Sequence, residues 1–314
     1  MKNYRTFVVL VLLAGAAGLV MLGNRDDRAD LSSVMEMVSD AQQDIAKTPN
    51  TLLRLSDPEE NQLGLKLLGD RPFRGGELPA LASYVAAVAG PLLTHVKRPG
   101  IAYRFHVIDS DGINAFAMPG GQIFVLRGLI DFVANEAELA SIIGHEIAHV
   151  DLRHCVDMYL MEVWMKKMGR TRSILKPGDI LVEISGMGAL YVTRLMQSGY
   201  RKFQEYDADA EGLNFITRAG YQPAASASAM KRIQDKFDAK GTKRPAPANP
   251  IDELARATES VAGEYFRSHP PTDERVQRLR AKAGSGGISE AGYRGMENLR
   301  RRIARSQQEF PNER

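Results

Sequence analysis

The feature that most constrains this 314-residue chain is a long amphipathic helix pattern with ionisable residues on its apolar side. The pattern predicts a helix from residue 136 to about 168, with Asn135 as its N-cap and Glu138 at the reciprocal capping position. Leucine, isoleucine and valine recur at helical spacing and mark the side that faces the core. The segment His145–His149 lies within that apolar stripe and has the form H-E-x-x-H.

His145 and His149 are separated by only ~40° of helical rotation, so both imidazoles point the same way. Two nitrogen donors on one face suit a tetrahedral Zn²⁺ ion, and Glu146 lies where it can act as general base. The alternative is a chance motif, with two core histidines that bond to backbone carbonyls. Because unpaired imidazoles and a carboxylate are costly in an apolar stripe, we prefer the zinc site.

A third protein ligand has to come from another part of the chain. His154 lies ~140° around the helix from His149, so we expect a polar contact there and not a metal ligand. Glu205 and Asp209 are four residues apart on a second predicted helix, where the glutamate can bind a metal and the aspartate can orient a histidine. Alone, this pair would indicate an acidic solvated face. Apolar neighbours and the upstream motif favour the ligand interpretation.

The remaining pattern predicts helices around a small sheet, an α+β fold that is mostly helical. Helical spacing covers residues 31–47, 59–69, 78–96, 129 to about 238, and 272–283. Runs rich in β-formers at 102–108, 113–117 and 122–125 predict three strands. A Pro-Gly-Gly sequence joins the last two strands and indicates a hairpin.

The first residues read as a targeting segment. Lys2 and Arg5 precede an unbroken apolar run over residues 7–22. This run is either a signal peptide that is removed or an uncleaved anchor, and its continuation to Leu22 favours the anchor. Positive charge before the run places the body of the chain outside the cytoplasmic membrane. We therefore expect a protein of the bacterial cell envelope on the periplasmic side, anchored in the inner membrane or soluble after cleavage.

The order of motifs resembles the HtpX/BepA/Oma-like family of membrane-associated or periplasmic zinc metalloendopeptidases, peptidase family M48. In this family an H-E-x-x-H helix is followed by E-x-x-A-D, here Glu205–Asp209. Four further segments match in order: Glu60–Gly64, Asn114–Gly121, Ala219–Pro223, and Ser268–Thr272 with Arg275. The resemblance covers about residues 56–283. It implies a zincin-like fold with a small sheet beside the active-site helix.

The resemblance also implies one Zn²⁺ per chain, held by His145, His149 and Glu205, with Asp209 holding one ligand histidine in the correct tautomer. Glu146 would take a proton from the attacking water and deliver it to the leaving amine.

The late His-Pro segment of the family lies near the metal, which makes His269 a candidate to stabilise the oxyanion or to occupy the water position in a resting enzyme. From the sequence alone, a surface histidine before two prolines is the alternative. Tyr200 and Arg201 are weaker candidates for the oxyanion. Where the family usually has an arginine three residues before the metal-binding glutamate, this chain has Lys202, so the roles of Arg201 and Lys202 stay open.

The predicted strand that contains Asn114, Ala115, Phe116 and Ala117 is a candidate to bind an extended substrate along its edge, with an ordinary interior strand as the alternative. Edge pairing reads backbone more than side chains, which suits unfolded proteins. We therefore expect a zinc-dependent endopeptidase that hydrolyses misfolded or damaged envelope or membrane proteins. The second hypothesis is a catalytically latent zinc-binding chaperone or adaptor, tethered to the membrane.

Composition and patterning set the outer limits. The 41 basic and 38 acidic residues give a net charge of +3, which argues against a nucleic-acid partner, and the single cysteine, Cys155, excludes an internal disulfide framework. We expect a signal or anchor over residues 1–25 and a zinc metallopeptidase domain over 26–283, with a flexible loop at 241–267. A charged tail over 284–314 is predicted to be a solvated helix or disordered.

Overall fold

The computed structural model describes residues 54–69, 76–160, 199–238, 269, 272–285 and 291–313. All of them belong to one unit, Leu53–Arg314, and the preceding unit, Met1–Leu52, lies outside the described residues. The predictions for the apolar run, for the helix at 31–47 and for the loop at 241–267 therefore fall outside as well. Among the helices that are described, none is long and apolar enough to cross a bilayer.

Two helices precede the sheet, close to where the sequence predicts them. Helix α3 spans Asp57–Gly69 and helix α4 spans Pro79–Leu93. Helix α3 packs on the turn η1 (Pro119–Gly121) through Gly64, where a Cβ atom would lie 2.4 Å from the carbonyl oxygen of Pro119. The glycine thus permits a backbone approach that no other residue allows.

The sheet has three strands in the order β1-β3-β2. Their bounds are Arg104–Ile108 for β1, Ala115–Met118 for β2 and Gln122–Leu126 for β3. Strands β2 and β3 form the predicted antiparallel hairpin, whereas β1 runs parallel to β3. Within the part of the chain that is described, β2 is therefore an edge strand.

Helix α5 (Arg127–Phe132) leads into α6 (Glu136–Asp151), the helix that carries the H-E-x-x-H motif. The predicted N-cap is confirmed, because the side chain of Asn135 accepts a hydrogen bond of 2.9 Å from the backbone N–H of Glu138. The Glu138 carboxylate reaches back to the N–H of the residue before the cap, at 2.8 Å.

The predicted single helix to residue 168 is wrong at its middle. The chain turns after α6, and Arg153 adopts a left-handed φ of 68° before residues 154–160 become helical again. This turn brings the Arg153 guanidinium to the carbonyl oxygen of Leu55, 2.8 Å away, at the start of α3. Apolar spacing continues through the turn, so periodicity alone does not reveal it.

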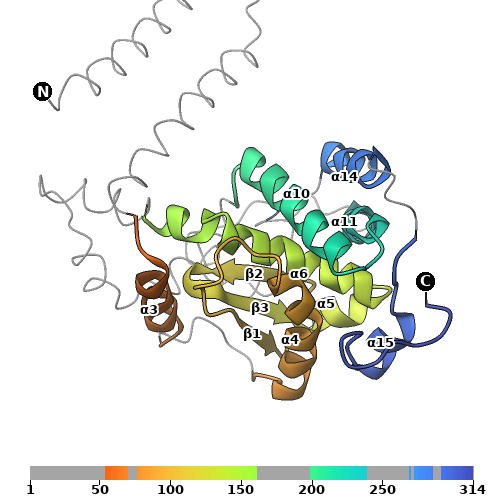
Figure 1. Cartoon of the computed structure of the whole chain (residues 1–314), viewed down its shortest axis with the longest axis horizontal. Coiled ribbons are helices and arrows are strands. Elements are labelled where there is room, and N and C mark those ends of the chain that lie inside the picture. Colours follow the sequence, from red (N-terminus) through yellow and green to blue (C-terminus); the bar gives the residue numbers. More distant parts are fainter. Residues whose placement is uncertain are drawn as a thin grey trace, which may run out of the picture. The chain divides into compact units, whose positions relative to one another are not determined.

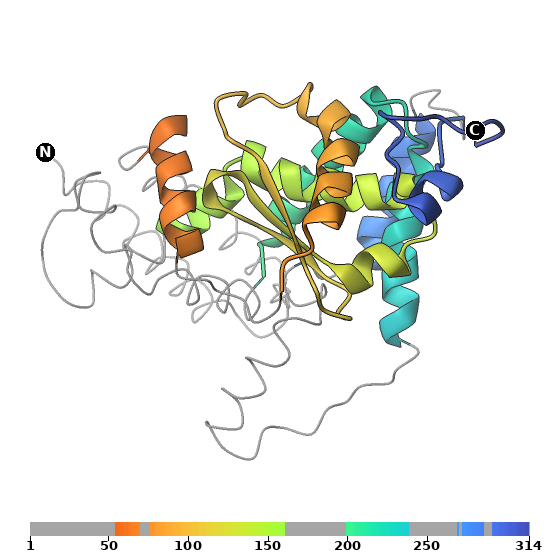
Figure 2. The ribbon, with the colours of Figure 1, turned by 90° about the horizontal axis from the view of Figure 1, so that it is seen from below.

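Helices α10 (Lys202–Arg218), α11 (Ala224–Asp238) and α14 (Asp273–Ser285) lie on the side of α6 away from the strands (Figure 1). Helices α6 and α10 cross in close contact, since a Cβ atom on Gly212 would lie 2.9 Å from the backbone nitrogen of His145. Helices α3 and α15 (Met296–Arg301) lie at opposite ends of α6 in both views (Figures 1 and 2).

The prediction of a solvated or disordered tail is wrong for residues 291–313. This segment contains α15 and buries Tyr293, Leu299 and Ala304 against the rest of the unit. Its apolar residues are too irregularly spaced to form an amphipathic pattern, and its arginines pair with acidic neighbours such as Glu297 and Glu309. The predicted fold class is confirmed: a mostly helical α+β unit with a small sheet beside α6. The predicted domain boundaries stay a prediction.

Candidate metal centre

Three separate parts of the chain bring together four side chains of the types that bind metal ions. Helix α6 contributes His145 and His149, α10 contributes Glu205, and His269 comes from just ahead of α14. We call these four residues the metal group. All are buried, with exposed fractions between 0% and 5%. One donor atom from each lies within 4.8 Å of every other.

The individual distances within the metal group are short and similar. His145 Nε2 lies 3.0 Å from His149 Nε2 and 3.2 Å from His269 Nδ1. The Glu205 carboxylate oxygens lie 3.0 Å from His269 Nδ1, 3.4 Å from His149 Nε2 and 3.5 Å from His145 Nε2. The four donors therefore converge on one point, as they would around a single cation.

Asp209 and Arg275 hold this arrangement from behind. Asp209 Oδ1 lies 3.1 Å from the Nδ1 atom of His145, which leaves Nε2 free to face the metal group. Arg275, on α14 and 2% exposed, donates to both oxygens of Asp209 at 2.8 and 2.7 Å and lies 2.5 Å from Glu205. One buried guanidinium thus bonds to two buried carboxylates and offsets one of their two negative charges.

His149 is fixed by two other neighbours. Its Nδ1 atom lies 3.0 Å from His154 Nδ1, so His154 makes the polar contact that the sequence predicts for it. The Tyr200 ring stacks on the His149 ring with centroids 3.8 Å apart, and its hydroxyl lies 3.2 Å from Cys155 Sγ. These contacts orient the second histidine as Asp209 orients the first.

Glu146 lies next to the metal group and differs from every other carboxylate around it. It is 0% exposed, and its oxygens accept no side-chain hydrogen bond from the described residues, although the backbone N–H of Ala117 faces them. His269 Nε2 lies 3.3 Å from its Oε1 atom. Burial raises the pKa of Glu146, against the opposite effect of His269 and His145. A buried carboxylate with unused oxygens is costly, which indicates a group kept for a partner bound during function.

Charge is unevenly distributed over the metal group. Burial opposes a charge on His145, but Asp209 and Glu205 outweigh it and raise its pKa to about 9. Burial holds the pKa of His149 well below its usual range. For Glu205, the cost of burial is outweighed by Arg275 and the neighbouring histidines, so its pKa lies well below the usual range. The group therefore combines an ionised carboxylate with a neutral His149, and a cation bound there would displace the proton that Asp209 and Glu205 hold on His145.

The other residues that the sequence singles out lie around this site. The strand segment predicted to bind substrate falls on β2 and the residue before it, and β2 packs beside α6. Arg201 and Lys202 are exposed at the start of α10, and Lys202 pairs with Glu274 at 2.9 Å.

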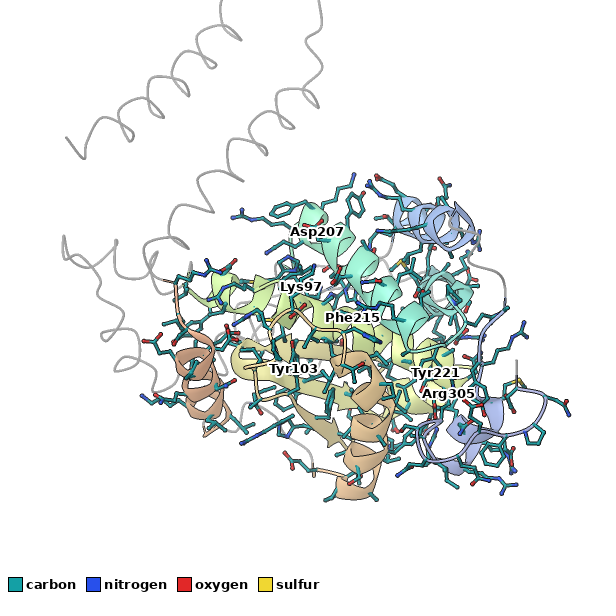
Figure 3. All side chains as sticks on the ribbon, viewed as in Figure 1. Lys97, Tyr103, Asp207, Phe215, Tyr221 and Arg305 are labelled. Atoms are coloured by element: carbon teal, nitrogen blue, oxygen red, sulfur yellow. The ribbon has the colours of Figure 1, made fainter. Side chains whose placement is uncertain are left out.

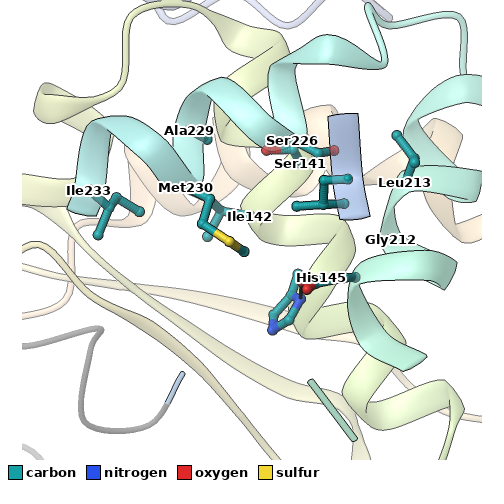
Figure 4. Close-up of a pocket in the computed structure, with 11 residues that line it drawn as sticks. Ser141, Ile142, His145, Gly212, Leu213, Ser226, Ala229, Met230 and Ile233 are labelled. Atoms are coloured by element: carbon teal, nitrogen blue, oxygen red, sulfur yellow. Dashed lines mark ion pairs between the residues drawn. The ribbon is translucent and has the colours of Figure 1, made fainter. Parts of the chain in front are cut away.

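A small cavity of about 30 Å³ opens between α6, α10, α11 and α14, beside His145 and Asp209 (Figure 4). Its lining is mostly apolar and includes Leu213 and Met230. Because pockets for small molecules typically hold about 300–1,000 Å³, this cavity is too small for a ligand of that class.

Two histidines and a glutamate on crossing helices, beside a buried second glutamate, are the requirements of metal-dependent peptide hydrolysis. The fold and the site therefore define the class, a zincin-like metallopeptidase. The family model described as "Peptidase family M48" matches residues 79–283, and the chain belongs to this family of metallopeptidases.

Curated relatives agree with this assignment. The chain is 30% identical over 194 residues to the "Beta-barrel assembly-enhancing protease" of Escherichia coli (strain K12), covering 58% of this chain and 39% of that protein. It is 27% identical over 180 residues to "Mitochondrial metalloendopeptidase OMA1" of Arabidopsis thaliana, 57% of this chain and 31% of the relative. It is 25% identical over 239 residues to "Metalloprotease LoiP" of Escherichia coli (strain K12), 74% of this chain and 84% of the relative. The chain thus spans well under half of the first two relatives.

Sequence analysis did not assign a role to Arg275, although it lies in one of the matched segments. The sequence holds one indication of its role. Arg275 is only six residues after His269 and lies in the first turn of the helix that follows the prolines, so the two residues can reach the same site. The stacking of Tyr200 on His149 carries no such signal, since the two residues are 51 positions apart in sequence.

Proposed function

We propose that the chain is a zinc-dependent endopeptidase and that the metal group holds one Zn²⁺ ion. At zinc–ligand bonds of about 2.0–2.1 Å, two donors of a tetrahedral site lie about 3.3–3.4 Å apart. Five of the six separations within the metal group, measured to one or the other Glu205 oxygen, are 3.0 to 3.5 Å and bracket this value. This agreement is the single observation that carries the proposal. A bound zinc ion would polarise the scissile carbonyl and lower the pKa of water.

The residues of the chain divide the remaining work. Glu146 takes the proton of the attacking water and passes it to the leaving amine, because it is the buried carboxylate beside the metal group that accepts no side-chain hydrogen bond from the described residues. Asp209 holds His145 in the tautomer that presents Nε2, and Arg275 keeps both Asp209 and Glu205 ionised and in place.

His269 has two roles in this proposal. It supplies the fourth donor in the resting protein, because its Nδ1 atom lies among the donors of the other three side chains. Its Nε2 atom lies 3.3 Å from Glu146, so the same side chain also covers the general base. Displacement of His269 by substrate would open both positions, and the displaced imidazole could then donate to the oxyanion.

Strand β2 is the proposed substrate-binding edge. An extended substrate would pair along Asn114, Ala115, Phe116 and Ala117. Its edge position and its packing beside α6 support this role, because an extended peptide paired there would run past Glu146. Recognition through backbone suits unfolded chains. We propose misfolded or damaged proteins of the bacterial envelope as substrates, as the name of the β-barrel assembly-enhancing protease suggests. The apolar run at 7–22 would place the enzyme on the periplasmic side, as an inner-membrane anchor or a cleaved signal.

A second candidate function rests on the way in which His269 covers Glu146 and fills the fourth donor position. A protein in which this side chain never leaves the metal group would hold zinc without cleaving peptides, and would act as a latent zinc-binding chaperone or adaptor.

One experiment separates the two functions. The purified chain and its Glu146→Gln variant are analysed for metal by mass spectrometry and incubated with casein as an unfolded substrate. We expect one zinc per chain in both proteins, and a loss of cleavage of about 10³-fold in the variant. Glu211→Gln, which alters an ion pair with Lys97 on the surface of α10, is the matched control and should retain full cleavage.

An active Glu146→Gln variant would remove Glu146 as general base. Zinc without cleavage of any unfolded substrate would favour the latent chaperone or adaptor.

A further inference from the structure

The N-terminal end of α6 is completed by residues from the far end of the chain. The first four N–H groups of a helix have no partner within the helix. In α6, those of Glu136 and Ala137 donate to the carbonyl oxygens of Gly295 at 3.1 Å and Arg294 at 2.9 Å. Asn135 satisfies that of Glu138 with its side chain, and its carbonyl accepts the first intrahelical bond, from Leu139. Half of the cap on the metal-binding helix therefore comes from the segment 291–313.

The side chain of Glu136 is bound by the same segment. Glu136 is 0% exposed, and its oxygens accept hydrogen bonds from the hydroxyls of Tyr84 at 3.0 Å and Tyr221 at 2.7 Å. The backbone N–H of Arg305 donates the third, at 2.8 Å. We call these four residues the Glu136 cluster. It joins α4, α6, the turn after α10 and the C-terminal segment.

The segment also grips the helix that carries Glu205. Arg305 Nη1 donates to the carbonyl oxygen of Ala219, the C-cap of α10, at 2.8 Å. Its guanidinium lies over the Tyr221 ring, 5.4 Å from the centroid, and Figure 3 shows these two side chains next to each other. Tyr293 donates through its backbone N–H to the carbonyl oxygen of Gly220, at 3.1 Å. Arg305 thus contacts both metal-binding helices, α6 by its backbone and α10 by its side chain.

We propose that residues 291–313 are a clamp that fixes the relative position of α6 and α10, and that Arg305 is its central positioning residue. The two helices meet at Gly144 and Gly212. The clamp binds the N-terminal end of α6 and the C-terminal end of α10. Since the histidine donors are on α6 and Glu205 is on α10, the clamp sets the spacing within the metal group. The segment lies beyond residue 283, where the family match ends. This inference rests on the proposed zinc site for its activity readout only.

The test compares the full-length chain with Arg305→Ala, Arg305→Lys and Arg300→Ala. Arg300 lies in α15 and is the matched control, because its side chain is 70% exposed and bonds to Glu297. Amide hydrogen exchange is measured at Glu136 and Ala137, together with kcat and KM on casein and the rate of zinc loss to a chelator. The exchange measurement is made on metal-free protein, so its outcome is independent of the proposed function.

For Arg305→Ala we expect exchange at Glu136 and Ala137 to rise at least about tenfold, with kcat lower by about fivefold or more and KM within about twofold. Zinc loss becomes faster by a similar factor. The KM should change little because the proposed substrate-binding strand, β2, belongs to the sheet and not to the clamped helices. Arg305→Lys should recover most of each effect, since an ammonium can still donate to Ala219, and Arg300→Ala should match the wild type.

Wild-type exchange, kcat and zinc loss in a folded Arg305→Ala protein would overturn the clamp. If that variant does not fold, Asn298→Ala replaces it. Asn298 holds the segment together from within by donating to Ile303 at 2.8 Å and Gln308 at 2.7 Å, and it belongs to neither helix. A folded Asn298→Ala protein with wild-type values would equally reject the proposal. Altered exchange with no zinc in any variant would support the clamp and reject the zinc site.

Discussion

Helix α6 carries two buried carboxylates that the chain treats in opposite ways. Glu136, in the Glu136 cluster, accepts three hydrogen bonds from two tyrosine hydroxyls and a backbone N–H. Glu146, beside the metal group, is equally buried and accepts no side-chain hydrogen bond from the described residues. Burial raises the pKa of both. A raised pKa and full burial therefore do not distinguish structure from chemistry, whereas the use of the oxygens does.

The two sites also differ in how charge is balanced. The Glu136 cluster is held by neutral donors, so it behaves as a buried hydrogen-bond network. The metal group depends on charge. Arg275 pairs with both Glu205 and Asp209, and these two carboxylates favour a positive charge on His145. The four predictions below use this difference, from the largest expected effect to the smallest.

Removal of the buried guanidinium should have the largest effect. Arg275→Ala leaves Glu205 and Asp209 buried without their cation, which should cost about 3–5 kcal/mol and lower the Tm by roughly 10 °C. Differential scanning calorimetry measures the change. Arg278→Ala is the control. Arg278 lies about one turn after Arg275 on α14, its side chain is 59% exposed, and its removal should change the Tm little. If both variants melt alike, the metal group does not depend on charge balance.

Stability of the metal-free protein should depend on alkaline pH. The pKa of His145 is raised from 6.5 to about 9, so its contribution is complete below pH 6.5 and is lost as the pH rises through 9. The loss should reach up to about 3 kcal/mol. Urea unfolding in the presence of chelator at pH 6, 7.5 and 9.5 tests this.

Asp209→Asn should flatten that pH profile, because it removes a principal group that raises the pKa of His145. The Glu136 cluster titrates outside this window, because burial raises the pKa of Tyr84 and Tyr221 above the ordinary value of 10. Burial raises the pKa of Glu136, and its protonated form is favoured on folding, so stability falls as the pH climbs above 4.5. A metal-free wild type with equal free energy of unfolding at all three pH values would contradict the raised pKa of His145.

Matched substitutions at the two glutamates should then give opposite results. Glu136→Gln weakens charge-assisted bonds and places an amide N–H₂ among donors, which should cost about 1–2 kcal/mol. Glu146→Gln removes a buried charge, breaks no side-chain hydrogen bond to a described residue and keeps an oxygen for the backbone N–H of Ala117, so stability should stay equal or rise. Thermal melting of the two variants checks this, and a larger loss at Glu146 would reverse the comparison.

The smallest effect concerns the local part of the α6 cap. Asn135→Ala removes the side-chain bond to the N–H of Glu138 and should cost about 1 kcal/mol, with casein cleavage unchanged. Chemical unfolding and the cleavage assay together measure both outcomes. A loss of cleavage in this variant would show that the cap, and not only the C-terminal clamp, positions the metal-binding helix.

Local chemistry explains which parts of the molecule could be predicted. The Asn135 cap, the β2–β3 hairpin and the pairs His145–His149 and Glu205–Asp209 each depend on residues within five positions of one another, so spacing carries the information. The convergence of α6 and α10 required the resemblance to a family. The left-handed turn at Arg153 was hidden because apolar spacing continues through it.

The C-terminal clamp could not be predicted for a different reason. Its contacts join residues about 160 positions apart, such as Arg294 and Ala137, and most of them are backbone hydrogen bonds that leave no side-chain pattern. A run of arginines read as a solvated tail because their acidic partners are spread through the same segment.

Zinc K-edge X-ray absorption of the purified full-length protein tests the central claim most directly. The account predicts one zinc per chain with a single shell of four nitrogen or oxygen donors at about 2.0–2.1 Å, including the multiple-scattering features of three imidazoles. The His269→Ala protein should show two imidazoles. A sulfur donor at about 2.3 Å, an octahedral oxygen shell, or a spectrum that does not change in His269→Ala would contradict the metal group as the ligand set.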